Sequence, residues 1–391
     1  MLPEFFAFYC PTKVVYEAGI VSDLKPELDI IGIKKYFVVS DHIINDLGLV
    51  QKVADGLAEA GCEMVGTFLD VKQDARLSDV NTCTEAVKAS GAEGIISVGG
   101  GSVIDTAKAV NIIFSEGGDL VEDYSGGHLL TRPLKPHIVV PTTAGTGSEV
   151  TMLSVIYDEE NKEKLFFADK FLHPNLAVLD PEMTLSLPPK LTASTGMDAL
   201  THSIEAYVGI EAAPFSDAFA AGAIELIMKY LVAATEDGED LDARGAMLIA
   251  SAMAGIAFTH SMVGCVHGMA HITGALYRVP HGEANAIYLP YGMEYNFEEI
   301  TEKLARLTPI MGEDVTGLSE EDAARKAIEA IRKLTGRLHE LGALPIKLSE
   351  VGVPEEGLKE IADAVPSDGT SFYNPREIDE EELLPYIQRA F

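Results

Sequence analysis

Short apolar runs alternate with helical patterns over residues 14–180, and no other feature of the sequence limits the fold as strongly. The runs that read as strands are residues 34–40, 62–68, 94–101 and 137–143. Helical patterns separate these runs, and the first extends from Ile44 to Ala60, with Gly61 closing it. This strand–helix–strand rhythm is typical of a parallel sheet with helices on both faces. We therefore predict a Rossmann-like α/β domain in the first half of the chain.

The second half of the chain has a different pattern. From Leu187 onward the sequence is almost wholly helical in character, with Gly and Pro as punctuation. The segment LSLPP, residues 185–189, is typical of a linker. With 391 residues the chain is also long for a single hydrophobic core. We therefore predict an α/β nucleotide-binding domain over residues 1–186 and an all-α domain over residues 187–391.

The charge balance of the chain excludes some classes of partner. The sequence has 29 basic and 61 acidic residues, which gives a net charge of -32. A surface this negative repels nucleic-acid phosphates and anionic lipids, so we expect neither nucleic-acid nor membrane partners. The apolar stretch over residues 246–266 is long enough to span a membrane, but it is rich in small residues and contains His260. We interpret it as a buried core helix.

The cysteines and the N-terminal sequence indicate a compartment. The chain has four scattered cysteines without a CxxC pair: Cys10, Cys62, Cys83 and Cys265. Scattered cysteines of this kind are typical of reduced thiols. The N-terminal sequence lacks a basic start followed by a long apolar run, which is the pattern of a signal peptide. We therefore expect a cytoplasmic protein.

Three histidines lie close together in residues 264–290. His267 and His271 are four residues apart on an apolar helical pattern, so their side chains lie on one face. We expect Pro280 and Gly282 to end this helix and leave His281 at the head of the next element. One buried histidine is more often a hydrogen-bonded core residue, but two on one face with a third just beyond favour a metal or catalytic cluster.

A second segment offers further metal ligands. Asp198 and His202 are again four residues apart, and a carboxylate and an imidazole at this spacing can bind one ion from one helix. Together with His267 and His281 they supply one carboxylate and three imidazoles. This donor set suits Zn(II) or Fe(II) and has too much nitrogen for Ca(II) or Mg(II).

Two loops that contain glycine follow predicted strands. Gly99, Gly100, Gly101 and Ser102 connect the strand at 94–101 to a helix, where glycine lets a ligand approach the backbone closely. The turn is not GxGxxG, and a plain tight turn explains it about as well. The second loop, residues 141–151, contains four threonines, two glycines and a serine. Loops at the carboxyl ends of successive strands are where α/β sheets bind nucleotides.

Asp41 lies at the end of an earlier predicted strand. A carboxylate in this position binds a ribose hydroxyl and disfavours NADP, because it repels the 2′-phosphate. The simpler interpretation is a helix N-cap.

Six motifs, in order, resemble the iron-containing (group III) alcohol dehydrogenase family. They are GGGSVIDTAK, PTTAGTGSEVT, LDP, TGMDALTHSIEAY, HGMAHITGALYRVPHG and NPR, and they extend over essentially the whole chain. The resemblance implies a nucleotide-binding domain followed by a helical domain that holds the metal and the active site. It also implies an oxidoreductase that interconverts a small primary alcohol or diol and its aldehyde with NAD, or less readily NADP. The resemblance further suggests that the protein forms a homodimer or a larger homo-oligomer.

The resemblance also implies roles for individual residues. The metal, usually Fe(II) and sometimes Zn(II), has Asp198, His202, His267 and His281 as ligands. His271 matches a histidine beside nicotinamide and substrate that does not bind metal. The cofactor residues are Asp41, Gly99, Gly100, Gly101, Ser102, Thr142, Thr143, Thr146, Lys164 and Phe258. Three alternatives remain at this point. They are a hydroxyacid–oxoacid transhydrogenase that retains its cofactor, a relative of dehydroquinate synthase or glycerol dehydrogenase, for which we expect a different ligand set, and a non-catalytic metal-binding subunit.

Overall fold

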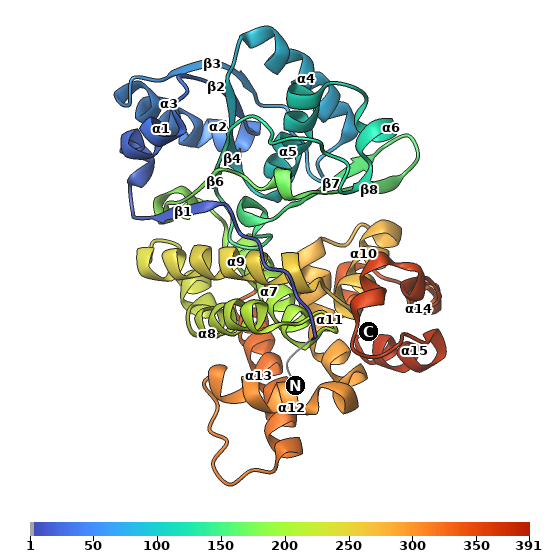
Figure 1. Cartoon of the computed structure of the whole chain (residues 1–391). Coiled ribbons are helices and arrows are strands. Elements are labelled where there is room, and N and C mark those ends of the chain that lie inside the picture. The colour runs from blue at the N-terminus through green and yellow to red at the C-terminus, as the bar shows by residue number, and fades with distance from the viewer. Residues whose placement is uncertain (1–3) are drawn as a thin grey trace. The chain divides into compact units, whose positions relative to one another are not determined.

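A computed structural model describes residues 4–391, which form two compact units (Figure 1). The first unit consists of Tyr9–Thr143 and Gly147–Ser186. The second consists of Leu187–Phe391 together with residues 4–8 and 144–146. The predicted division by a single boundary was therefore too simple, because two short pieces of the first half pack with the helices. Within the second unit, for example, the ring of Phe8 stacks on that of His260 with 4.3 Å between centroids.

The first unit contains a six-stranded sheet in which every neighbouring pair is parallel, as predicted. The strand order is β1-β9-β6-β4-β2-β3. The strands are β1 (Lys13–Tyr16), β2 (Lys35–Val39), β3 (Glu63–Phe68), β4 (Gly94–Gly99), β6 (His137–Pro141) and β9 (Leu176–Leu179). The four predicted strands are all present. The four-residue strands β1 and β9 were not predicted.

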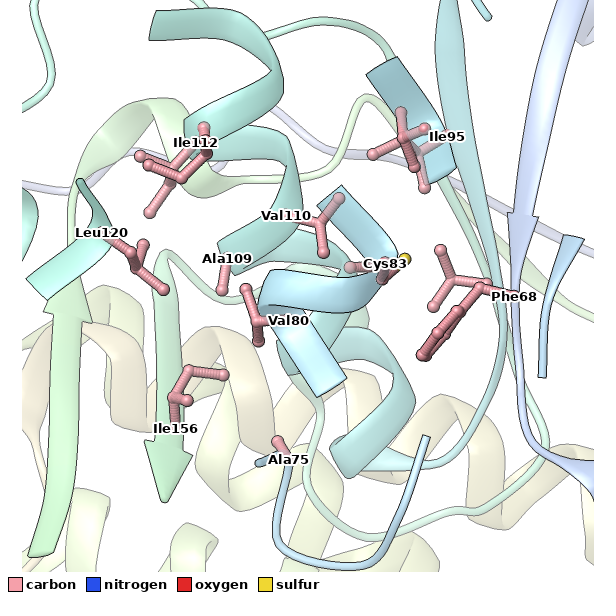
Figure 2. Close-up of a cluster of buried hydrophobic side chains, with 14 of the residues drawn as sticks. Phe68, Ala75, Val80, Cys83, Ile95, Ala109, Val110, Ile112, Leu120 and Ile156 are labelled. Atoms are coloured by element: carbon pink, nitrogen blue, oxygen red, sulfur yellow. The ribbon is translucent and has the colours of Figure 1, made fainter. Parts of the chain in front are cut away.

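Helices cover both faces of this sheet, because alternate side chains of its strands enter different hydrophobic clusters. Tyr36 and Val38 of β2 belong to a cluster with residues of the helices α1 (Lys25–Ile31) and α3 (Leu49–Glu59). The intervening residue Phe37 belongs to the other cluster. That cluster includes residues of α4 (Leu77–Ser90) and α5 (Gly101–Glu116), and Figure 2 shows Val80, Cys83 and Val110 of these helices within it.

Two parts of the first unit differ from the prediction. The single helix expected from Ile44 to Ala60 is two helices, α2 (His42–Asp46) and α3, because Gly48 between them has a left-handed backbone with φ of 79°. A second, three-stranded sheet was also missed. It consists of β5 (Gly126–Gly127), β7 (Leu153–Asp158) and β8 (Glu163–Ala168), of which β7 and β8 pair antiparallel, and α6 (Leu120–Tyr124) precedes it.

The second unit is helical, as predicted, and residues 187–391, all of which the structure describes, contain no strand. Its helices are α7 (Pro189–Val208), α8 (Pro214–Glu236), α9 (Leu241–Ser261), α10 (Cys265–Tyr277), α11 (His281–Tyr295), α12 (Phe297–Ile310), α13 (Glu320–Glu340), α14 (Leu358–Ala364) and α15 (Glu380–Arg389). By length and composition alone α8 and α9 could cross a membrane, but core helices of soluble proteins pass the same test. Most of α9 is buried and packs against α7 and α8, as expected for a core helix.

The connection between α10 and α11 leaves His281 as the first residue of α11, as predicted, but the role of Gly282 differs from the prediction. The helix α10 ends at Tyr277, and Arg278 follows with a left-handed backbone, φ 60°. Gly282 does not end a helix but is the second residue of α11. A Cβ atom at this position would lie 2.4 Å from the carbonyl oxygen of Ser194 on α7. Glycine is therefore needed there so that α11 can approach α7 closely.

Candidate metal centre and active site

Helix α7 places three ionisable side chains on one buried face. Asp198, His202 and Glu205 are spaced four and then three residues apart, which is the repeat of one helical face. All three are buried in the second unit. Since buried ionisable groups need partners, this face of α7 must meet other polar groups.

The helices α10 and α11 bring His267 and His281 to Asp198. One donor atom from each of these three residues lies within 4.8 Å of the other two. The Oδ1 atom of Asp198 is 3.4 Å from Nε2 of His281 and 3.8 Å from Nε2 of His267. Burial lowers the pKa of His267 well below its usual value, so its ring is neutral and able to bind a metal. The trio therefore fits a divalent metal that prefers nitrogen and oxygen donors.

The fourth predicted ligand, His202, lies beside the trio but is not part of it. Its ring stacks on that of His267 with 4.5 Å between centroids, and its Nδ1 atom is 3.9 Å from Oδ2 of Asp198. This Nδ1 atom is buried and makes no hydrogen bond, which is costly unless something else binds the ring. An orphaned imidazole beside three donors is consistent with a metal site. The ligand role of His202 stays a prediction. The ring of Phe258 also stacks on that of His202, with 4.3 Å between centroids.

Two residues that contact the trio were missed in the sequence. Glu205 Oε2 lies 2.6 Å from Nδ1 of His267. Asn285 donates from Nδ2 to Oδ1 of Asp198 at 2.7 Å, and the same Nδ2 lies 3.1 Å from Nε2 of His281. Both had a sequence signal, since Glu205 is seven residues after Asp198 and Asn285 is four residues after His281, on the same helical faces.

His271 lies next to the trio without belonging to it. Its ring is 5.3 Å from that of His281 and 6.1 Å from that of His267, between centroids. Its Nδ1 atom is 3.1 Å from Oδ2 of Asp368. Burial alone would raise the pKa of Asp368, but the hydrogen bond from His271 lowers it, and the net effect is a decrease. Asp368 was also missed, because it is 97 residues away in sequence. A partly exposed imidazole oriented by a carboxylate is suited to proton transfer.

The two glycine loops of the first unit lie together. A Cβ atom at Gly99 would lie 2.6 Å from the side chain of Val103, and one at Gly100 would lie 3.1 Å from that of Thr143. The side chains of Val103 and Thr143 therefore leave little room for a residue larger than glycine at these two positions. The backbone N–H of Thr142 also donates to the carbonyl of Gly99 at 3.1 Å. This region contains the predicted cofactor residues Gly99, Gly100, Gly101, Ser102, Thr142 and Thr143 at the carboxyl ends of β4 and β6.

Two parts of the chain match families of known proteins. Residues 11–181 match the family described as iron-containing alcohol dehydrogenase, and residues 192–391 match the Fe-containing alcohol dehydrogenase family, C-terminal. The chain belongs to the iron-containing alcohol dehydrogenase family. The predicted family and fold class are confirmed, and so is an oxidoreductase that acts on alcohols.

Relatives of this family match along their whole length. The NAD-dependent methanol dehydrogenase of Bacillus methanolicus is 37% identical, over 98% of this chain and 99% of that protein. The 1,3-propanediol dehydrogenase of Klebsiella pneumoniae is 38% identical, over 99% of each chain. A crystal structure of a 1,3-propanediol oxidoreductase superposes with a TM-score of 0.94 at 38% identity and covers 99% of this chain and all of that one.

A buried lysine connects the two glycine loops of this family member. The Nζ atom of Lys108, on α5, donates to the Ser148 hydroxyl at 3.1 Å, to the carbonyl and hydroxyl of Thr151 at 2.9 Å each, and to the Leu153 carbonyl at 2.8 Å. Burial lowers the pKa of Lys108 to about 8, and the charge of Asp105 opposes this decrease. The lysine fixes the second loop to the helix that starts at the first. It follows Asp105 by three residues in the GGGSVIDTAK motif, a spacing that places both side chains on one side of α5.

The remaining predicted cofactor residues lie at separate places. Asp41 caps α2, accepting a hydrogen bond from the N–H of Ile44 at 2.9 Å, which is the simpler role expected for it. Lys164 lies on β8 opposite Tyr157 of β7. Thr146 groups with the helical unit. Their cofactor roles stay predictions.

Proposed function

We propose that this enzyme oxidises a small primary alcohol or diol with NAD, or reduces the corresponding aldehyde, at an iron centre. Its ligands are Asp198, His202, His267 and His281. One observation carries the proposal: a buried carboxylate and two imidazoles from three different helices converge within 4.8 Å. The names of relatives that act on methanol and 1,3-propanediol support a small substrate.

In this mechanism the chain supplies the ligands, the orientation and a proton path. Asp198, His202, His267 and His281 would hold the metal, which would supply a Lewis acid for the substrate oxygen. The glycine turn at residues 99–102 would hold NAD, which would supply the hydride acceptor. His271 accepts the alcohol proton and, because its side chain is 30% exposed, passes it to solvent. Asp368 keeps the His271 ring in one orientation through its contact with Nδ1.

The cofactor residues of the first unit support NAD as the oxidant. The N-terminus of α5 follows the glycine turn and offers backbone N–H groups to a pyrophosphate. The carboxylate of Asp41 repels the 2′-phosphate of NADP, which favours NAD. The name of the NAD-dependent relative supports the same choice.

We further propose a cytoplasmic homodimer or larger homo-oligomer. The four scattered cysteines have the pattern of reduced thiols, which supports this location. The net charge of -32 is unfavourable for binding nucleic acid or anionic membranes.

The proposed function predicts alcohol-dependent NADH formation that depends on iron. Protein loaded with Fe(II) without oxygen is mixed with NAD and a panel of small alcohols and diols, and NADH absorbance is followed. We expect turnover by the loaded wild type. The His267→Ala variant should lose the ion and on the order of 1000-fold in activity, since a Lewis acid contributes several kcal/mol.

Circular dichroism is the control for this experiment. The His267→Ala variant should keep the helical and sheet signals of the wild type, because the sheet lies in the other unit. Activity that survives removal of all metal would contradict the proposal. NADH that forms but is never released would instead favour a transhydrogenase that retains its cofactor.

A further inference from the structure

We propose that Glu205 is a positioning residue that fixes His267 as a metal ligand and increases the metal affinity of the site. This inference rests on the proposed function, because it assumes that His267 binds the ion.

The side-chain oxygens of Glu205 contact the start of α10. Its Oε2 atom lies 2.6 Å from Nδ1 of His267, and its Oε1 atom accepts a hydrogen bond from the N–H of Val266 at 2.7 Å. The side chain is buried, with 5% of the residue exposed, so water does not compete for these contacts. A short contact between a carboxylate and an imidazole in a dry environment is strong.

This contact determines which nitrogen of His267 carries the proton. Burial raises the pKa of Glu205 to about 7, whereas hydrogen bonds from the backbone N–H groups of Gly264, Val266 and His267 oppose this increase and favour the ionised carboxylate. An ionised carboxylate only accepts hydrogen bonds, so in this state Nδ1 of His267 is the donor. In the neutral ring the proton then lies on Nδ1, and the lone pair of Nε2 is left for a metal. Nε2 is also the nitrogen that lies 3.8 Å from Oδ1 of Asp198, within the trio.

Glu205 also fixes the backbone that carries His267. The residue before α10, Gly264, has no side chain to cap the helix, and Cys265 N–H donates instead to Oδ1 of Asn374 at 3.1 Å. Glu205 satisfies the next N–H group, that of Val266. A Cβ atom at Gly264 would lie 2.8 Å from Asn374 Oδ1 and 3.2 Å from Glu205 Oε1, so glycine is needed for this approach.

One helix therefore supplies two of the proposed ligands and the support for a third. Asp198, His202 and Glu205 repeat on a single face of α7, and the third member contacts a ligand from α10. Movement of α10 away from α7 would therefore break the Glu205 contacts and, at the same time, separate His267 from Asp198. Carboxylates that hold metal-binding histidines in this way typically change metal affinity 10- to 100-fold on mutation.

The test compares metal affinity in the wild type and in Glu205→Gln. The glutamine keeps the size and an oxygen for the N–H of Val266, but its amide nitrogen then faces Nδ1 of His267 and can donate a hydrogen bond there but not accept one. We expect Fe(II) and Zn(II) to bind roughly 10- to 100-fold more weakly, measured by competition with a chelator. The visible spectrum of the Co(II)-loaded protein should change as well, because the position of His267 changes.

The matched control is Glu149→Gln. Glu149 is an equally buried glutamate, 2% exposed, but it lies in the other unit. Loss of a buried carboxylate there should leave metal affinity and the Co(II) spectrum unchanged. If Glu205→Gln does not fold, Glu205→Asp replaces it, because the shorter carboxylate cannot reach both Val266 and His267.

The outcomes separate this inference from the proposed function. A wild type that binds no divalent metal contradicts the proposed function itself. A wild type that binds metal, with a folded Glu205 variant of equal affinity and an unchanged Co(II) spectrum, contradicts only the role of Glu205. Weaker binding in the Glu205 variant, with an unchanged Glu149→Gln control, supports it.

Discussion

At the scale of single residues, the proposed function assigns the transfer of the substrate proton to His271. The residue is close to the trio, oriented by Asp368 and partly open to solvent. General acid–base catalysis typically contributes about 100-fold or more to turnover. We therefore expect His271→Ala to lower turnover about 100-fold and to change the shape of its pH–rate profile.

Metal content is measured on the same samples and should equal that of the wild type, since His271 is not in the trio. His339→Ala is the matched control, because His339 is a half-exposed histidine of the same unit that contacts the carbonyl of Leu344. An unchanged pH–rate profile in His271→Ala would contradict the relay.

The sequence predicted the residues of the trio better than the residues that contact them. The four-residue spacings identified Asp198 and His267, which do meet in space. Glu205 repeats on the same helical face, but its spacing from Asp198 does not show that it contacts His267 on another helix. Asp368 had no local signal, because a contact over 97 residues depends on how the chain returns. Spacing on one helix is visible in a sequence, whereas convergence of distant segments is not.

At the scale of elements, Lys108 links the two glycine loops. It lies on α5 and donates to Ser148, Thr151 and Leu153 of the second loop and β7. We expect Lys108→Met to weaken NADH binding roughly 10-fold, since each hydrogen bond to a charged group contributes about 1.5–3 kcal/mol to stability and the loop loses its anchor. Titration of NADH fluorescence measures this affinity.

Lys88→Met is the control for this variant, because Lys88 is an exposed lysine of the same unit that pairs with Glu85. It should bind NADH as the wild type does. Metal affinity should be unchanged in both variants, since the trio lies in the other unit. Wild-type NADH affinity in a folded Lys108→Met would show that the network does not position the loop.

Elements with long apolar runs were predicted correctly, and shorter ones were not. The strands β2, β3, β4 and β6 are rich in β-branched and aromatic residues, which the pattern identifies. By contrast, β1 and β9 have four residues each, too few for a period to be evident. The break between α2 and α3 depends on the left-handed backbone of Gly48, and the sequence does not distinguish it from a glycine inside a helix.

At the scale of the whole molecule, the order of motifs was the most informative signal. The α/β character of the first half and the helical character of the second follow from the periodicity, and a TM-score of 0.94 to a solved relative confirms the fold. Residues 4–8 and 144–146 depart from this division, because their packing on the helices depends on side chains such as Phe8 that carry no domain signal.

The central claim is that one divalent metal is bound by Asp198, His202, His267 and His281. A crystal structure of the iron-loaded protein, with data collected at the iron absorption edge, tests it most directly. The account predicts one anomalous peak per chain, with an oxygen of Asp198 and a nitrogen of each of the three histidines about 2.0–2.2 Å away. A peak bound by other residues, or one that leaves out Asp198 or His281, would contradict it.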